Sequence, residues 1–311
     1  MMAGGRSDAG AGMRASVRSS GGMALVLTLM IVAIITAMVV EFAYGIYTST
    51  TSLSNWETSQ QLSLAARSAI KLAARVVAEK AQSTATTGSF EIAQKVPFGD
   101  LDTTITLRIE DENAKFNLNS IIYPNGQLNV EKYKEFVRLL NALKLPTALA
   151  DRIADWIDPD TEPRLGDSEQ GAKNSFLDSV DELLLIPGID RKTYEQLLPY
   201  VTIYGSGYTQ GLININDAAV PVLMSLSDDI DEQMAERVIQ YRSITPFAAP
   251  GGICSVSGFE NICFKLMNNI TTARYSFHVV ATAQAAGVKR TIDSVLDLAG
   301  TKTVVRYWKE M

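Results

Sequence analysis

Residues 23–40 of this 311-residue chain read MALVLTLMIVAIITAMVV, eighteen positions without a charged side chain. A helix of that length covers roughly 27 Å, which is close to the hydrocarbon thickness of a bilayer. A secretory signal peptide would have a shorter apolar region, followed by small residues at a cleavage site. The stretch therefore predicts the membrane-spanning part of a helix, over residues 23–43.

The segments on either side of the apolar stretch predict its orientation and its continuation. Residues 1–22 carry three arginines against one aspartate, which places the leader in the cytoplasm and the chain after about residue 45 outside it. No proline interrupts residues 23–82, and Gly45 is their only glycine. Apolar residues then recur at spacings of three and four, which predicts a helix packed on a domain outside the cytoplasm: Leu62, Ala65, Ala66, Ala69, Ile70, Ala73 and Val76.

Composition argues against several classes of function. The net charge is −6, and the leader contributes +2, so the remaining chain carries −8 and repels nucleic-acid phosphates. One histidine and two cysteines are too few for a zinc site built from these residue types. The sequence has no Gly-rich phosphate loop, GxSxG or HExxH motif, and His278 lies in an alternating strand pattern, as a structural residue would. We therefore expect no enzyme.

The rest of the chain predicts an α+β fold. Ile105, Leu107 and Ile109 alternate as in a half-buried strand, and strand patterns return over residues 275–286, 289–299 and 303–310. Between them lie short helical segments and a weak internal repeat, in which NLNS at 117–120 corresponds to NIND at 214–217.

We therefore expect a pilin-like long N-terminal helix with an antiparallel sheet, interrupted by a mostly α-helical insertion with helix-hairpin-helix or SAM-like repeats. The predicted domains are a leader at 1–22, a transmembrane part at 23–43, a pilin-like α/β domain at 44–120 and 263–311, and a helical insertion at 121–262.

The loop DPDTEPRLGDSE at 158–169 has acidic residues at places 1, 3, 5 and 12 and Leu165 at place 8, a spacing that lets one loop wrap Ca²⁺. Pro163 stands at place 6, where a regular EF-hand needs glycine. The candidate ligands of a structural calcium ion are Asp158, Asp160, Glu162, Asp167 and Glu169. Asp155 and Asp178 lie near enough to contribute instead. The alternative is an acidic, solvated junction between a helix and a loop.

Cys254 and Cys263 flank a loop containing Gly and Ser. In an oxidising compartment they could form a disulfide that contributes about 2–3 kcal/mol to stability. The alternative is two buried thiols.

A basic leader that ends in Gly21-Gly22 before an apolar helix resembles the type IV prepilin class. The resemblance implies that a prepilin peptidase cuts between Gly22 and Met23. Most pilins carry a glutamate at the fifth mature position, where it pairs with the terminal amine of a neighbour. Here that position is Leu27, as expected of a subunit with no neighbour beyond it.

Further segments resemble the K-type minor pseudopilin of type II secretion systems (general secretion pathway protein K). They are DENAKFNLNS at 111–120, ADWIDPDTEP at 154–163, SVDELLLIPGI at 179–189, ININDAA at 213–219 and the strands ending at Trp308. The family implies a single-pass inner-membrane protein with a periplasmic C-terminal domain. Such a subunit joins the I and J types of minor pseudopilin and caps a fibre that supports export across the outer membrane. The family also binds calcium in the acidic region. The segment at 166–176 departs from the aromatic residues that the family more often has there.

A DNA-binding function is the main alternative. LLLIPGIDRKTYEQLL at 183–198 resembles half of a helix-hairpin-helix, which would suit a minor pilin of a type IV pilus or DNA-uptake system. Asp190 follows its turn where a second glycine would aid close approach of the backbone to a phosphate, and the surroundings are acidic. We expect neither a nucleic acid nor a small-molecule substrate as partner.

Overall fold

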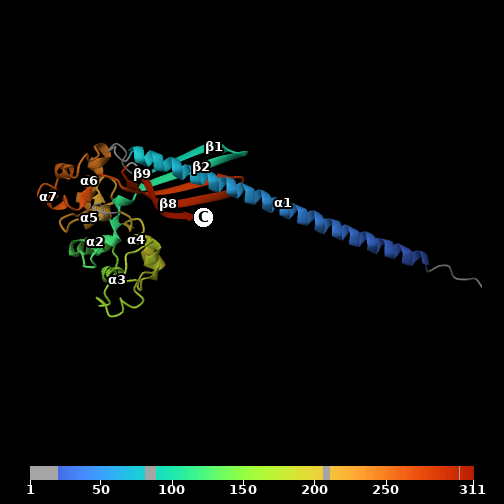
Figure 1. Ribbon diagram of the computed structural model, residues 1–311, viewed down its shortest axis with the longest axis horizontal. Helices are drawn as coiled ribbons and strands as arrows, with labels where there is room; N and C mark the ends of the chain where they lie inside the picture. The colour runs from blue at the N-terminus through green and yellow to red at the C-terminus, as the bar shows by residue number, and fades with distance from the viewer. Residues whose placement is uncertain (1–19, 81–88, 206–210, 301) are drawn as a thin grey trace, which may run out of the picture. The chain divides into compact units, whose positions relative to one another are not determined.

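The computed structural model describes residues 20–80, 89–205, 211–300 and 302–311 (Figure 1). The chain forms two compact units, residues 1–57 and 58–311. Helix α1 (Ser20–Lys80) runs through both, so the predicted long helix is present. Most of the predicted leader, residues 1–19, lies outside the described residues.

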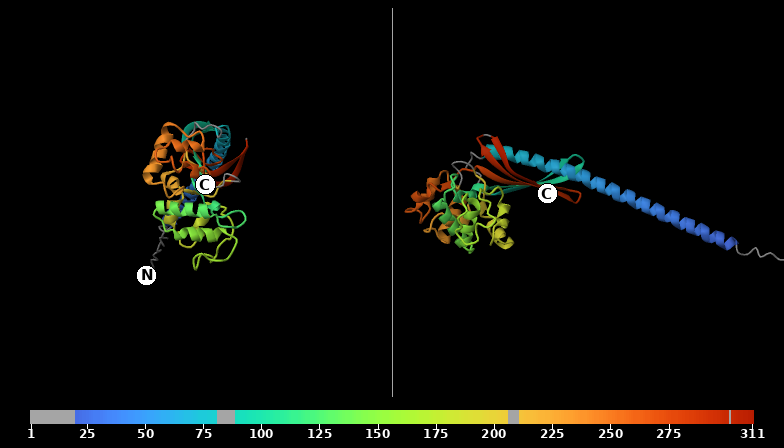
Figure 2. Two further views of the ribbon diagram at one scale, coloured as in Figure 1. Left: turned by 90° about the vertical axis from the view of Figure 1, so that its left-hand side faces the viewer. Right: turned by 60° about the horizontal axis from the view of Figure 1, so that its bottom comes forward.

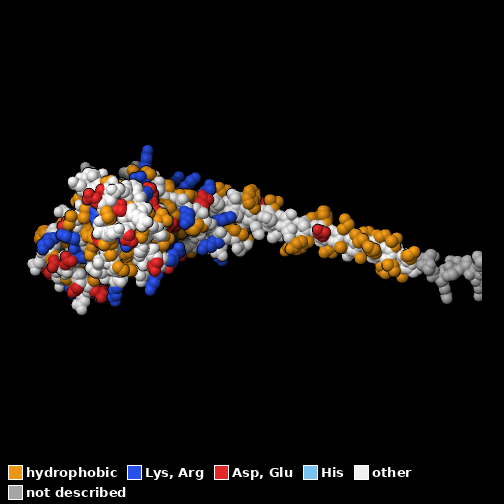
Figure 3. All heavy atoms as spheres, turned by 90° about the horizontal axis from the view of Figure 1, so that it is seen from below, with side chains coloured by type: hydrophobic (Ala, Val, Ile, Leu, Met, Phe, Trp, Pro, Cys, Tyr) orange, Lys and Arg blue, Asp and Glu red, His pale blue; other side chains and the backbone are white. Residues whose placement is uncertain are grey.

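The part of α1 in the first unit is apolar and uncovered. Among the described residues, one helix is long and apolar enough to cross a membrane, and its most apolar window has a mean hydropathy of 2.9 and no buried residue. Leu27, for example, is 60% exposed. Figure 3 shows apolar side chains along this part of the helix, whereas charged side chains gather on the second unit. These features are compatible with a membrane anchor.

The second unit contains a five-stranded antiparallel sheet in the order β1-β2-β7-β8-β9 (Figure 1). Its strands are β1 (Phe90–Phe98), β2 (Leu101–Asp111), β7 (Ser276–Ala285), β8 (Val288–Ala299) and β9 (Lys302–Glu310). The predicted strands correspond to β2, β7, β8 and β9, whereas β1 was not predicted.

The C-terminal part of α1 packs on one face of the sheet. Its buried apolar residues are those of the predicted stripe, except that Val77 is buried in place of Val76. They pack against apolar side chains of three strands, chiefly Leu107, Ile109, Phe277, Val279, Ala281, Ile292 and Leu296.

The chain between β2 and β7 forms a second core made of short elements, which Figure 2 shows gathered at one end of the sheet. Its helices are α2 (Val130–Ala142), α3 (Ala148–Ile157), α4 (Arg191–Leu197), α5 (Val220–Ser225), α6 (Glu232–Ile244) and α7 (Cys263–Leu266). The 3₁₀ helices among the described residues are η1 (Glu112–Ala114), η2 (Leu118–Ile121), η3 (Val180–Leu185) and η5 (Pro250–Ser255). Two short parallel pairs join β3 (Phe116–Asn117) to β4 (Val201–Thr202) and β5 (Ile213–Asn214) to β6 (Ile270–Thr271).

The internal repeat is visible in two asparagines that make the same contacts. The Asn119 side chain donates to the carbonyl of Leu177 (3.0 Å) and accepts from its N–H (2.9 Å). Asn216 does the same with Phe247, at 2.9 and 2.8 Å. Asn119 and Leu177 are 58 residues apart along the chain, whereas Asn216 and Phe247 are 31 apart. The first copy of the repeat is therefore longer, and it contains the acidic loop. The helix-hairpin-helix or SAM-like character of the repeats and the predicted domain boundaries stay predictions.

A buried polar network ties the helical part to the sheet where the chain leaves and rejoins it. Asp111 at the end of β2 accepts from the Asn113 N–H (2.9 Å) and from the Asn214 amide (2.6 Å). Asn113 in turn accepts from the N–H groups of Tyr275 and Ser276, at 2.8 and 2.9 Å. Burial, followed by the nearby charge of Asp217, raises the pKa of Asp111 to about 8.

The two cysteines form a disulfide within the second copy of the repeat. Cys254 lies in η5 and Cys263 begins α7, with their Cα atoms 5.2 Å apart. The bond ties η5 to α7 across the intervening turn.

Candidate metal centre

Three carboxylates meet where α3 ends. Asp155 lies in the last turn of α3, and Asp158 caps the helix with extended backbone, as the following proline favours. Glu169 comes from the loop beyond, and one oxygen from each of the three residues lies within 4.8 Å of the other two. Asp155 and Asp158 are completely buried, which is costly for charged groups unless they are paired or bind a cation.

The structure brings together two of the five predicted ligands, Asp158 and Glu169. The other three lie on the exposed side of the loop and are not part of the cluster. Asp160 accepts from the backbone N–H of Glu162 (2.9 Å), which closes a local turn. Asp167 is paired with Arg152 at 2.8 Å. Asp155, which lies near enough in the sequence to serve as an alternative ligand, completes the cluster.

Arg164 partly neutralises the cluster from within the loop. Its guanidinium group donates to both Asp155 and Asp158, and its backbone N–H donates to Asp155 at 2.8 Å. The Ser168 hydroxyl donates to Asp155 as well. One arginine thus faces three carboxylates, so the cluster keeps an excess of negative charge.

Several oxygens of the cluster are left without a donor. Asp158 Oδ1 and both carboxylate oxygens of Glu169 are buried and have no hydrogen-bond partner among the described residues. Burial, followed by the neighbouring carboxylates, raises the pKa of Glu169. Burial also raises the pKa of Asp158, against the opposing effect of Arg164. Buried oxygens without donors are what a bound cation would satisfy.

The donor set indicates which cation fits. The ligands are carboxylate oxygens, with no sulfur or imidazole in the cluster as described. Hard divalent cations prefer such ligands, and calcium tolerates the irregular geometry of a flexible loop better than magnesium does. The residues present therefore fit a calcium ion.

A family model matches the part of the chain that contains the acidic loop. The family model described as type II secretion system, protein K matches residues 114–206 and 213–266, in two parts. Type II secretion system protein K of Pseudomonas aeruginosa is 32% identical over 157 residues, 44% of each chain, so the alignment spans less than half of that relative. The protein K of Aeromonas hydrophila is 27% identical over 73% of this chain and 77% of its own length.

A solved structure has the same fold as this chain. It is GspK in the GspK-GspI-GspJ complex of the type II secretion system from enterotoxigenic Escherichia coli, with a TM-score of 0.68 at 20% identity. The match covers 84% of this chain and 99% of that one. None of these comparisons favours the DNA-uptake alternative. The two matched family regions, the curated relatives and the shared fold agree, and each of them likens this chain to type II secretion system protein K.

Proposed function

We propose that this chain is a minor pseudopilin that caps the tip of the periplasmic pseudopilus and supports protein export across the outer membrane. The observation that carries the proposal is the combination of one long apolar helix, an antiparallel sheet and a large helical insertion in a single chain. This is the fold of GspK in a complex with GspI and GspJ. We infer that the partners here are likewise minor pseudopilins of the I and J types.

Two features of the chain favour the end of the fibre. The helical insertion has its own core and is too bulky to repeat at every step of a tightly stacked fibre. Leu27 offers no carboxylate to a following subunit, so the contact that usually extends the fibre is absent. Such a chain works through its surfaces and not through catalysis.

The N-terminal part follows from the same proposal. A prepilin peptidase would cut between Gly22 and Met23, leaving α1 free to pack sideways on partner helices in the inner membrane. The residues after about 45 would lie in the periplasm, on the side opposite the basic leader.

We also propose that Asp155, Asp158 and Glu169 hold a structural calcium ion. The ion would supply positive charge to buried carboxylates and would tie the loop after α3 to the helix end. By linkage, a ligand that binds only the folded state stabilises it. Calcium would therefore act as a staple for the first copy of the repeat.

The experiment is co-expression of the full-length chain with the I- and J-type pseudopilins and the prepilin peptidase of the same secretion system. An affinity tag on this chain should recover both partners in detergent, together with a mature chain that begins at Met23. The matched control carries Gly22→Leu, which blocks processing, and should retain residues 1–22. Recovery of this chain alone, processed and folded, would contradict the assembly role.

A further inference from the structure

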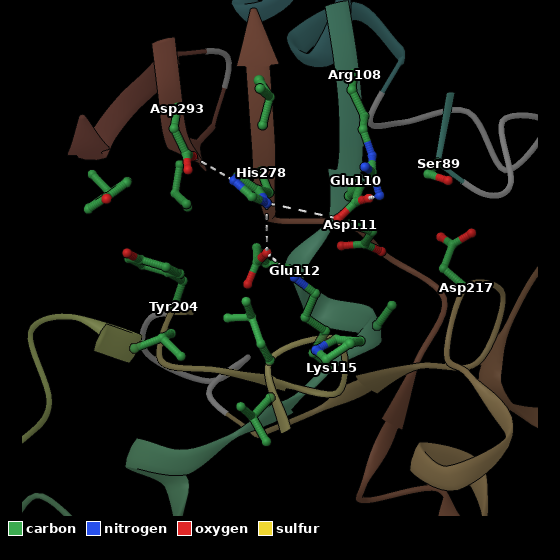
Figure 4. A pocket seen from close by; sticks show the side chains of 18 of the residues that line it. Ser89, Arg108, Glu110, Asp111, Glu112, Lys115, Tyr204, Asp217, His278 and Asp293 are labelled. Carbon is green, nitrogen blue, oxygen red and sulfur yellow. Dashed lines mark hydrogen bonds and ion pairs between the residues drawn. The ribbon is translucent and has the colours of Figure 1, made fainter. Parts of the chain in front are cut away.

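A pocket of about 530 Å³ lies between the sheet and the helical insertion, away from the acidic loop. Side chains alternate along a strand, so Ile109 and Val279 face α1 while Glu110 and His278 face the other side. The second wall comes from the insertion, including Tyr204 (Figure 4). We call this cavity the junction pocket.

The lining of the junction pocket is acidic. Its charged residues are the carboxylates Glu110, Asp111, Glu112, Asp181, Asp217 and Asp293, against Arg108, Lys115 and His278. Burial raises the pKa of Asp111 to about 8, so this carboxyl is left out of the charge count. Asp217 is paired at 2.6 Å with Arg274, which is not part of the lining. Without that pair, and with Asp111 left out, four carboxylates still face three cations, counting His278 as charged.

The pocket also has an aromatic and apolar side. The rings of Tyr204 and Tyr307 lie 6.5 Å apart at a tilt of 52°. Leu198, which is 40% exposed, and Pro199 extend this side toward solvent. An aromatic face beside carboxylates suits a side chain that has an apolar stem and a cationic end.

Two titratable side chains that line the pocket, His278 and Tyr204, have a raised pKa. His278 Nε2 lies 2.6 Å from Asp293, and Nδ1 lies 3.8 Å from Glu112 and 3.9 Å from Glu110. Burial alone would lower the pKa of His278, but the bond to Asp293 and the charge of Glu112 outweigh it, so the pKa is raised. The pKa of Tyr204 is raised by burial first and by Glu112 next. The field therefore favours positive charge inside the pocket.

We propose that the junction pocket binds a lysine or arginine side chain presented by a partner protein. The stem lies along Tyr204 and Tyr307, and the charged end lies among Asp181 and Asp293. The chain's own Lys309 comes within 4.0 Å of Asp181, so a basic side chain can reach this carboxylate. The apolar rim at Leu198 gives the neighbouring residues of a polypeptide a surface to pack on. The proposal stands whether or not the chain caps a fibre.

Binding of a cation and protonation of His278 oppose each other, because both add positive charge to one pocket. The groups facing His278 are Arg108 and Glu110 from β2, Glu112 and Lys115 at and after η1, Asp293 from β8, Tyr307 from β9, and Tyr204 from the insertion. Among them only His278 has an ordinary pKa close to neutrality, and the pKa of Asp111 in the same pocket is raised to about 8 by burial. Both groups make the pocket more negative as the pH rises. The affinity for a basic side chain should therefore rise with pH as His278 loses its proton.

The test uses the single histidine of the chain as a reporter. The full-length chain, purified in detergent through a tag without histidine, carries ring-labelled histidine and is titrated with Nα-acetyl-arginine amide. We expect saturable shifts of the one ring signal, with a dissociation constant on the order of 1 mM, and a lower His278 pKa at saturation. Asp181→Asn and Asp293→Asn should each weaken binding about threefold, as expected for partly exposed ion pairs. Asp228→Asn, at an 85% exposed carboxylate elsewhere in the insertion, should not change it.

Three comparison probes can each give a result that contradicts the proposal. Equal binding of Nα-acetyl-norleucine amide would show an apolar pocket, and tighter binding of Nα-acetyl-glutamate amide would show an anion site. Tighter binding of spermidine would indicate a free polyamine in place of a protein side chain. Thermal melts of each variant separate a lost site from a lost fold, and non-saturable shifts in folded protein would overturn the proposal.

Discussion

Arg164→Met should destabilise the metal-free chain far more than the calcium-bound chain. The Arg164 guanidinium contacts two carboxylates that are fully buried, and it is itself 25% exposed. Removing one partner of a fully buried pair costs about 3–5 kcal/mol, and the partial exposure of Arg164 lowers our estimate to about 2 kcal/mol. For a unit of this size that corresponds to a melting temperature about 4–8 °C lower in chelator.

Calcium should remove most of this difference. A cation held by Asp155, Asp158 and Glu169 supplies the positive charge that the variant lacks, and at 100 times its dissociation constant it stabilises the fold by about 2.7 kcal/mol. Melting the full-length chain in detergent, with chelator or with calcium, measures both effects. We expect the variant to lose less than half as much stability in calcium as in chelator.

A matched control separates this effect from general loss of an arginine. Arg138 is 19% exposed, lies in the insertion and pairs with Asp228, outside the acidic cluster. Arg138→Met should reduce stability equally with and without calcium. Glu169→Gln should abolish the calcium response. The reasoning is refuted if Arg164→Met costs the same in both conditions, or if calcium leaves the unmodified chain unchanged.

Other predictions concern the repeat, the histidine and the disulfide. Asn119→Ala and Asn216→Ala should each lower the unfolding free energy by about 2–3 kcal/mol in chemical denaturation, because each leaves a buried backbone N–H and carbonyl without the asparagine side chain. The control Asn125→Ala, in an exposed turn, should lower it by almost nothing. Protonated His278 should stabilise the fold fully below its unfolded pKa of about 6.5, and this stabilisation should be lost as pH rises through the raised folded pKa. The difference in unfolding free energy between the unmodified chain and His278→Gln should therefore shrink with rising pH, and a difference that grows would contradict the prediction. Replacing Cys254 and Cys263 by Ala should lower unfolding free energy by about 2–3 kcal/mol, and identical denaturation curves would exclude a stabilising bridge.

The strongest periodic patterns in the sequence were enough to predict most of the sheet and its helix. Ile105, Leu107 and Ile109 alternate because one face of β2 packs on α1, and the same holds for β7. Strand β1 gave no such signal. It is an edge strand with mostly exposed side chains and Pro97 near its end, so no alternation marks it.

The acidic loop was found from its spacing, but its internal geometry was not. Counting along the loop favoured Asp160 and Glu162, whereas which carboxylates come together depends on where α3 ends. Asp155 and Asp158 are three residues apart at that end, a spacing that places side chains close together on a helix. The pairing of Arg164 with both depends on how the loop closes, which spacing alone does not define.

The junction pocket could not be predicted from local sequence. Its residues Glu110, His278 and Tyr307 are distant along the chain and meet because β2, β7, β8 and β9 are neighbours in the sheet, while Tyr204 comes from the insertion. The sequence indicated a structural role for His278 from its strand position. The acidic and aromatic surroundings that suggest a binding role come from the tertiary fold.

The location of this chain on assembled fibres tests the capping role most directly. Fibres isolated from cells in which the chain carries a small C-terminal epitope tag can be labelled with gold-conjugated antibody and viewed by electron microscopy. A capping subunit predicts labelled fibres with gold at one end only, and no labelled fibres when Gly22→Leu blocks processing. Gold distributed along the fibre length would contradict the account.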